Sequence, residues 1–184
     1  MIRETSVSSS SLGFLRVAVV SPELRVADVA FNTEKIIEAM HASAKQGARL
    51  ALFPELCITA YSCGDLFFQP LLLEKSLVAL QMIAEATISA NSAAVVGLPL
   101  AVNGKLYNCA ALIANGQVHG FVPKSFLPST GEFYEERWFT PAAYCDAQSV
   151  SVAGSEIPLG PDLLFAATNF PDLILGVEIC EDLW

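Results

Sequence analysis

A carboxylate, an ammonium and a thiol each directly follow an apolar run of this sequence. Because functional groups gather at the carboxyl ends of strands in α/β sheets, we expect the three to converge if those strands are parallel neighbours. The carboxylate could then take the thiol proton, and the ammonium could stabilise an oxyanion. The three residues are Glu55, Lys124 and Cys180.

Each of these residues also has a simpler interpretation. A free cysteine is most often a small core residue, and a charged residue after a strand is commonly a solvated strand end. The usual partner of a nucleophilic cysteine is histidine, but the two histidines are predicted on an amphipathic helix (His41) and in a hairpin strand (His119). A Cys–His pair is therefore poorly supported, and the coincidence of all three groups favours the Glu-Lys-Cys hypothesis.

Composition limits the class of protein. The 184 residues suggest one domain, and a content of 53% hydrophobic but 16% charged residues suits fully buried strands. A net charge of −9 without a Lys/Arg cluster argues against a nucleic-acid partner. No apolar run reaches the roughly 20 residues of a membrane span. Five cysteines without a CxxC pair fit reduced thiols in the cytoplasm, and with only two histidines they argue against a zinc site.

The elements that must position these groups form a mixed pattern. Apolar spacing predicts two amphipathic helices, and Asn-Gly pairs at 103–104 and 115–116 predict a three-stranded antiparallel meander. We therefore expect an α/β fold of α+β type with a mixed sheet and helices on one face. The expected elements are a disordered leader (1–13), helices (27–46, 71–89), strands (14–20, 50–53, the meander 94–122, near 150, 163–168, 173–179) and a long irregular segment (125–148).

The chain stops four residues after Cys180, with no element to cover what would follow that predicted strand. We therefore expect the domain, residues 14–184, to be truncated at its C-terminus.

Three segments carry a family resemblance: residues 52–56, 122–128 and 177–182. They resemble the nitrilase, or carbon–nitrogen hydrolase, superfamily with its Glu-Lys-Cys triad. Within this superfamily, the sequence of residues 55–62, 131–137 and 178–182 is most similar to the amino-terminal glutaminase domains of glutamine-dependent NAD synthetases.

The resemblance implies a four-layer αββα sandwich that usually pairs with a second copy, giving a homo-oligomer. It implies Glu55 as general base, Lys124 as stabiliser of the tetrahedral intermediate and Cys180 as nucleophile. The substrate-binding positions that it implies are Tyr61, Thr130 and Glu181; related domains often carry a tyrosine where Thr130 stands. It places Glu132 near a fourth catalytic carboxylate, with Glu135 as a rival.

The implied reaction is hydrolysis of glutamine through a γ-glutamyl thioester, with no cofactor. The ammonia would pass to a C-terminal synthetase domain, where ATP and Mg would drive the amidation of deamido-NAD to NAD. That domain is expected to be absent here, since the sequence contains no Ser-Gly-Gly-x-Asp-Ser loop for ATP. Two other hypotheses stay open: a stand-alone nitrilase-like amidase that acts on another small amide, and a non-catalytic assembly domain.

Overall fold

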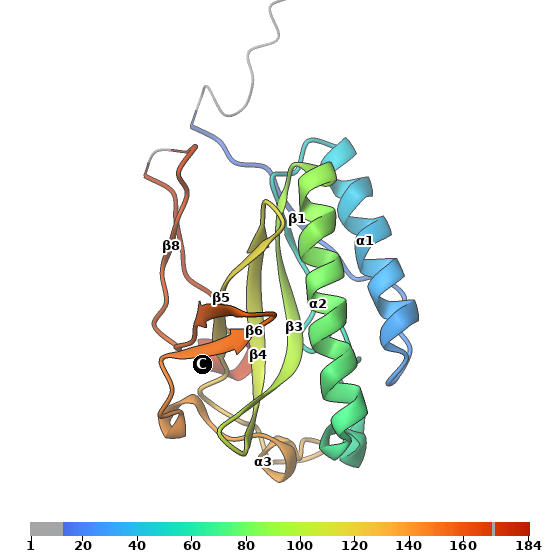
Figure 1. The fold of residues 1–184 in the computed structure, drawn as a ribbon, viewed down its shortest axis with the longest axis vertical. Helices are drawn as coiled ribbons and strands as arrows, with labels where there is room; N and C mark the ends of the chain where they lie inside the picture. The colour runs from blue at the N-terminus through green and yellow to red at the C-terminus, as the bar shows by residue number, and fades with distance from the viewer. Residues whose placement is uncertain (1–12, 171) are drawn as a thin grey trace, which may run out of the picture.

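The computed structural model describes residues 13–170 and 172–184 of the chain. Its centre is a five-stranded sheet in the order β1-β2-β3-β4-β5 (Figure 1). Most of the predicted leader, residues 1–12, lies outside the described residues. The five strands are β1 (Val17–Val19), β2 (Leu50–Leu52), β3 (Ala93–Val102), β4 (Lys105–Ala114) and β5 (Gln117–Pro123).

Strand direction decides where the candidate groups lie. Strands β1, β2 and β3 are parallel, whereas β3, β4 and β5 form the predicted antiparallel meander. Both turns of the meander use the Asn-Gly pairs, in which all four residues have positive φ. These φ values are what a two-residue hairpin turn requires, and asparagine and glycine tolerate them best. As a result, β2, β3 and β5 all point the same way, with β3 and β4 between β2 and β5.

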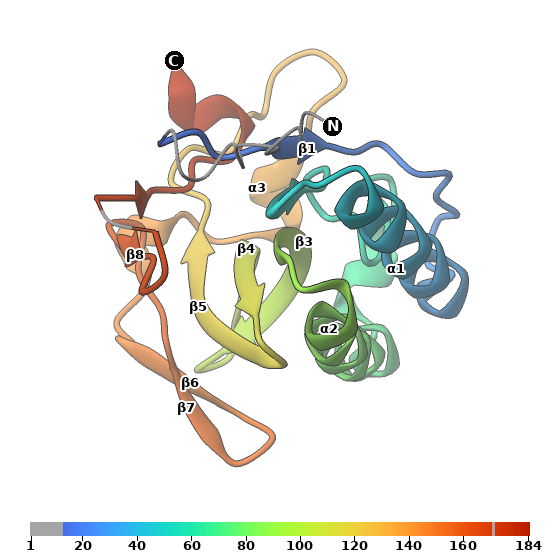
Figure 2. The same ribbon diagram turned by 90° about the horizontal axis from the view of Figure 1, so that it is seen from above.

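Two helices cover one face of the sheet (Figures 1 and 2), as the sequence predicts. They are α1 (Val29–Lys45) and α2 (Pro70–Ala90). The side chain of Asp28 caps α1 by accepting a hydrogen bond from the backbone N–H of Phe31, and Pro70 begins α2, where a missing N–H costs no intrahelical bond. Because the helices pack on one face of the sheet and the C-terminal part of the chain packs on the other, β3 is buried from Ala94 to Leu100.

The opposite face carries the C-terminal part of the chain. Ile179 packs there against Val95, Ala110 and Leu112. The prediction of a long buried strand over 173–179 is wrong. That region forms only the two-residue strand β9 (Ile174–Leu175), which pairs with β8 (Phe165–Ala166) rather than with the main sheet. Exposed positions alternate with half-buried ones there, so the run covers the sheet instead of lying within it.

The remaining elements are short. Strands β6 (Ser149–Val152) and β7 (Ser155–Pro158) form a hairpin. The segment predicted as irregular contains the four-residue helix α3 (Glu135–Trp138) and a 3₁₀ turn at Ala142–Tyr144. Two more 3₁₀ turns cover Gly64–Phe68 and Cys180–Leu183. Of the described helices, none combines the length and the apolar character that spanning a membrane requires.

Candidate active site

A buried lysine joins two carboxylates at the edge of the sheet where β2 and β5 end. The Nζ atom of Lys124 lies 2.7 Å from Glu55 Oε1 and 2.8 and 2.9 Å from the two carboxylate oxygens of Glu135. The side chains of Lys124 and Glu135 are 0% and 1% exposed. A charge buried this deeply is stable only with partners, and the two carboxylates supply them. The expected meeting of Glu55 and Lys124 is therefore seen in the structure, although their strands are not adjacent.

Glu55 is placed by a close approach of two backbones. It follows β2 at the point where the chain turns against β3, and the next residue, Leu56, has a φ of +52°. A Cβ atom on Gly97 would lie 2.2 Å from the backbone nitrogen of Leu56 and 2.9 Å from the carbonyl carbon of Glu55. Glycine at this position of β3 thus leaves the space that the Glu55 backbone occupies.

Asn108 is a member of this cluster that sequence reasoning missed. Its Nδ2 donates to Glu55 Oε1 at 2.6 Å and, more weakly, to Glu135 Oε2 at 3.5 Å. Its Oδ1 is buried without a hydrogen-bond partner in the described part of the chain. A polar residue inside the apolar strand β4 was the signal that could have identified it.

The second carboxylate of the cluster is Glu135, the rival of Glu132 in the sequence analysis. Glu132 is exposed, whereas Glu135 is the first residue of α3 and is buried. Tyr61, implied to bind substrate, instead donates from its hydroxyl to Glu135 Oε1 at 2.7 Å. Burial, followed by this bond to the carboxylate, raises the pKa of Tyr61, so the hydroxyl remains a donor. The implied role of Glu132 is not supported by this placement.

Exposed side-chain contacts of Asp65 connect the loop that follows Tyr61 to helix α3. Asp65 accepts two hydrogen bonds of 2.7 Å from the guanidinium of Arg137 and one of 2.9 Å from the indole N–H of Trp138. Beneath it, the buried Phe67 packs against Trp138 and Phe139 with ring centroids 6.0 and 4.9 Å apart. The loop that follows Tyr61 and helix α3, which carries Glu135, therefore pack as one unit.

Cys180 begins the last 3₁₀ turn and is exposed. Its φ of +50° lies in the left-handed region, which is uncommon for a residue with a side chain and often marks a functional position. Partial burial raises the pKa of the thiol; the charges of Glu55 and Glu135 raise it further, and that of Lys124 opposes them. The sulfur thus lies within electrostatic reach of the whole cluster.

The charges of the cluster also shift one another. Burial raises the pKa of Glu55, while Lys124 and Asn108 hold it down. Burial lowers the pKa of Lys124, but its bonds to Glu135 and Glu55 outweigh this effect and leave the pKa above 10.5. At neutral pH Lys124 is therefore an ammonium, and Glu55 is a stronger base than a solvent-exposed glutamate.

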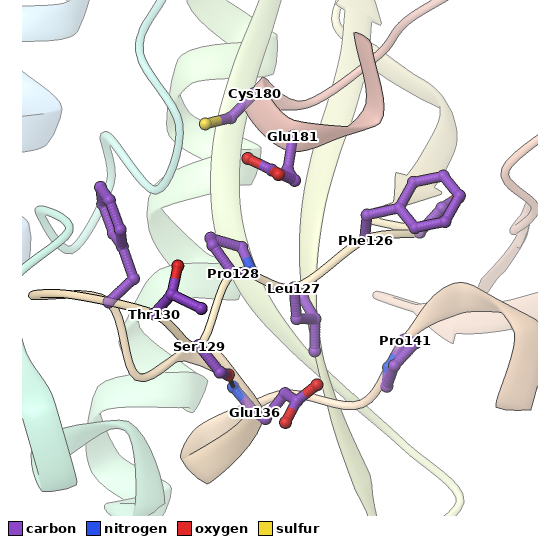
Figure 3. A pocket seen from close by; sticks show the side chains of 11 residues that line it. Phe126, Leu127, Pro128, Ser129, Thr130, Glu136, Pro141, Cys180 and Glu181 are labelled. Atoms are coloured by element: carbon purple, nitrogen blue, oxygen red, sulfur yellow. Dashed lines mark hydrogen bonds between the residues drawn. The ribbon is translucent and has the colours of Figure 1, made fainter. Parts of the chain in front are cut away.

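An open pocket of about 570 Å³ lies beside the thiol (Figure 3). Cys180 and Glu181 form one side of it, and residues 126–130 form the other, with Thr130 among them. Two of the three residues implied to bind substrate, Thr130 and Glu181, thus line this pocket; Tyr61 does not. The volume falls within the range of small-molecule sites.

The other cysteines differ from Cys180 in their surroundings. Cys57 is fully buried against Gly97, and this burial raises the pKa of its thiol to about 12. Cys63 and Cys109 are buried as well, and burial raises the pKa of each. Across the described ranges, no group of three or more His, Cys, Asp or Glu side chains is arranged to hold a metal ion.

Comparison with known proteins identifies the family that this sequence matches. Residues 16–184 match the carbon–nitrogen hydrolase family. The chain is 38% identical over 172 residues to a glutamine-dependent NAD(+) synthetase of Mycobacterium tuberculosis, covering 94% of this chain and 25% of that protein. It thus spans about a quarter of the length of that relative.

Solved structures give the same result. A glutamine-dependent NAD(+) synthetase from Cytophaga hutchinsonii superposes with a TM-score of 0.84 at 32% identity, covering 91% of this chain and 28% of that one. An amidase from Nesterenkonia shares the fold with a TM-score of 0.60 at 24% identity, over 79% of this chain and 54% of that one. The described sheet and helices thus have the architecture of both kinds of protein.

Proposed function

The chain belongs to the carbon–nitrogen hydrolase family, and from its site we propose that it hydrolyses the side-chain amide of glutamine through a thioester on Cys180. The observation that carries the proposal is the buried Lys124, held between Glu55 and Glu135, with the exposed thiol of Cys180 in reach of their charges. This set provides a nucleophile, a base and a cation at one place, which acyl transfer requires.

In the first half-reaction Glu55 takes the proton from Cys180 Sγ while the sulfur bonds to the amide carbon. The carbonyl π electrons move to oxygen, and the ammonium of Lys124 stabilises this oxyanion. The C–N bond then breaks, the nitrogen takes the proton from Glu55, and ammonia leaves a γ-glutamyl thioester. Lys124 has three N–H donors that now face three carboxylate oxygens, so the oxyanion would replace the longest contact, to Glu135 Oε2 at 2.9 Å.

In the second half-reaction Glu55 takes a proton from water, and the resulting hydroxide attacks the thioester carbon. The C–S bond breaks, the sulfur recovers the proton from Glu55, and glutamate leaves. Glutamine is the preferred substrate in this proposal because Glu181 places a carboxylate in the pocket, where an α-ammonium group would pair with it. Thr130 adds a hydroxyl on the opposite side.

We further propose that the ammonia serves a synthetase domain that amidates deamido-NAD with ATP and Mg. The relatives named above are NAD synthetases about four times as long as this chain, which supports a partner domain of that kind.

Release of glutamate and ammonia from glutamine, with mass spectrometry of the trapped protein, tests the reaction. We expect a γ-glutamyl adduct on Cys180 and no product from Cys180→Ala. Cys63→Ala is the matched control because it removes a buried thiol outside the cluster. Turnover of simple aliphatic amides but not of glutamine would overturn the glutamine proposal in favour of an amidase, and no adduct with any amide would overturn catalysis.

A further inference from the structure

No strand of the five-stranded sheet carries Cys180. Strand β9 ends at Leu175, pairs with β8 and lies outside the five-stranded sheet. Lys124, in contrast, follows β5 directly, and its backbone N–H donates to the carbonyl of Asn108 at 2.8 Å. The thiol and the ammonium are thus carried by separate parts of the fold, and their relative position needs a connection of its own.

Asp182 makes such a connection. Its Oδ1 accepts hydrogen bonds from the backbone N–H groups of Ser125 at 2.9 Å and Phe126 at 2.8 Å, the two residues after Lys124. Its Oδ2 accepts from the backbone N–H of Ile179 at 3.2 Å, the residue before Cys180. One carboxylate therefore binds the neighbours of the ammonium and of the thiol at the same time.

A local role in closing the 3₁₀ turn accounts for only part of this arrangement. The turn already has a backbone bond from Asp182 N–H to the carbonyl of Ile179 at 3.1 Å, and Oδ2 adds to it. The two bonds of Oδ1 reach residues 57 and 56 positions away. An ionised carboxylate accepts several such bonds, whereas an asparagine has one acceptor oxygen and would direct its NH₂ at an N–H donor.

We propose that Asp182 is a positioning residue that fixes Cys180 relative to Lys124. The proposal rests on the proposed function for the reaction that it serves, but the placement itself can be tested without substrate. Buried Ile179 anchors the same segment on the sheet, so Asp182 sets the orientation of the turn more than its attachment. Its loss should therefore leave the segment bound to the sheet and let the sulfur change its position relative to Lys124.

The experiment measures how strongly Lys124 influences the thiol. In the otherwise unchanged protein, Lys124→Ala should slow alkylation of Cys180 by iodoacetamide about fivefold or more, because the ammonium opposes the rise in the pKa of the thiol. In an Asp182→Ala background the same change should alter the rate less than about twofold. Glutamine turnover by Asp182→Ala should fall about 100-fold, the cost of roughly 1 Å of misplacement.

Controls separate this result from other outcomes. Glu178→Gln removes an exposed carboxylate from the same segment and should leave both the coupling and the turnover intact. Asp182→Asn keeps the side-chain volume and provides the same measurement if Asp182→Ala fails to fold. Loss of the Lys124 influence in either variant supports the proposal even if glutamine is not the substrate. An undiminished influence in the folded variants overturns it, even if glutamine is hydrolysed.

Discussion

Asn108 and Lys124 donate to the same oxygen of Glu55. Oε1 accepts from Asn108 Nδ2 at 2.6 Å and from Lys124 Nζ at 2.7 Å. With Oε1 occupied by two donors, we propose that Oε2 is the atom that takes the thiol proton of Cys180. The cluster thus fixes which oxygen of Glu55 can act as the base, in addition to shifting its pKa.

The first prediction concerns this shared oxygen. Asn108→Leu removes a donor that lowers the pKa of Glu55, so that pKa should rise further above its ordinary 4.5. Because the base acts only when ionised, the acid limb of kcat/KM for glutamine should move to higher pH. Asn108→Asp, which adds a like charge beside Glu55, should move it more. An acid limb unchanged in both variants would contradict the role of Asn108.

The second prediction uses the two glutamates near α3 as a matched pair. Glu135→Gln removes the buried charge that holds Lys124 and should lower glutamine turnover about 100-fold, the scale of losing a well-placed electrostatic partner. Glu132→Gln changes an exposed residue three positions earlier and should remain near the unchanged rate. Steady-state release of glutamate measures both; equal losses, or a larger loss in Glu132→Gln, would contradict the assignment of Glu135 to the cluster.

The third prediction concerns stability. Lys124→Met leaves Glu55 and Glu135 without their shared cation, which should cost about 3–5 kcal/mol near pH 8. Unpaired buried carboxylates have raised pKa values, so the folded variant binds protons more tightly than the unfolded chain. Its deficit should therefore shrink as the pH falls toward 4.5. Urea unfolding at several pH values tests this, with the exposed Lys75→Met as control.

The fourth prediction follows from the clearance at Gly97. Gly97→Ala places a methyl group 2.2 Å from the backbone nitrogen of Leu56, so the chain that carries Glu55 must move. We expect a loss of about 1–3 kcal/mol of stability and a larger loss of turnover than stability alone explains. In Gly176→Ala the new Cβ lies 3.5 Å from its nearest neighbour, an ordinary contact. That control should retain both properties, and a tolerated Gly97→Ala would refute the account.

The fifth prediction concerns the five thiols. Peptide mapping after brief treatment with iodoacetamide at pH 8 should find Cys180 modified first, because it is exposed. Cys57 and Cys109 should be modified last, since both are fully buried and burial raises the pKa of each thiol, that of Cys57 to about 12. In denaturant all five should react alike. Early modification of Cys57 in the folded protein would mean that its surroundings are more open than the structure has them.

Local patterns in the sequence were sufficient to predict the helices and the meander. The Asn103-Gly104 and Asn115-Gly116 turns need positive φ, which few residues supply, so both hairpins were fixed in advance. Those turns also determine that β5 runs parallel to β2, which brings Lys124 and Glu55 to one edge.

Contacts between distant segments were beyond such patterns. Glu135 begins the four-residue helix α3 and is buried, whereas Glu132 precedes the helix and is exposed. Asp65, which holds the helix through Arg137, lies some 70 residues earlier in the chain. The strand predicted before Cys180 failed for a related reason, because an apolar run can cover a sheet as well as extend it.

The excess of negative charge around Cys180 also affects how readily its sulfur is oxidised when no substrate is bound. Hydrogen peroxide oxidises thiolates far faster than thiols, and two carboxylates against one ammonium keep this sulfur protonated at rest. The exposed nucleophile is thereby less prone to sulfenic acid formation than an exposed thiol of ordinary pKa, and it becomes strongly nucleophilic only when Glu55 takes its proton during attack on a bound amide.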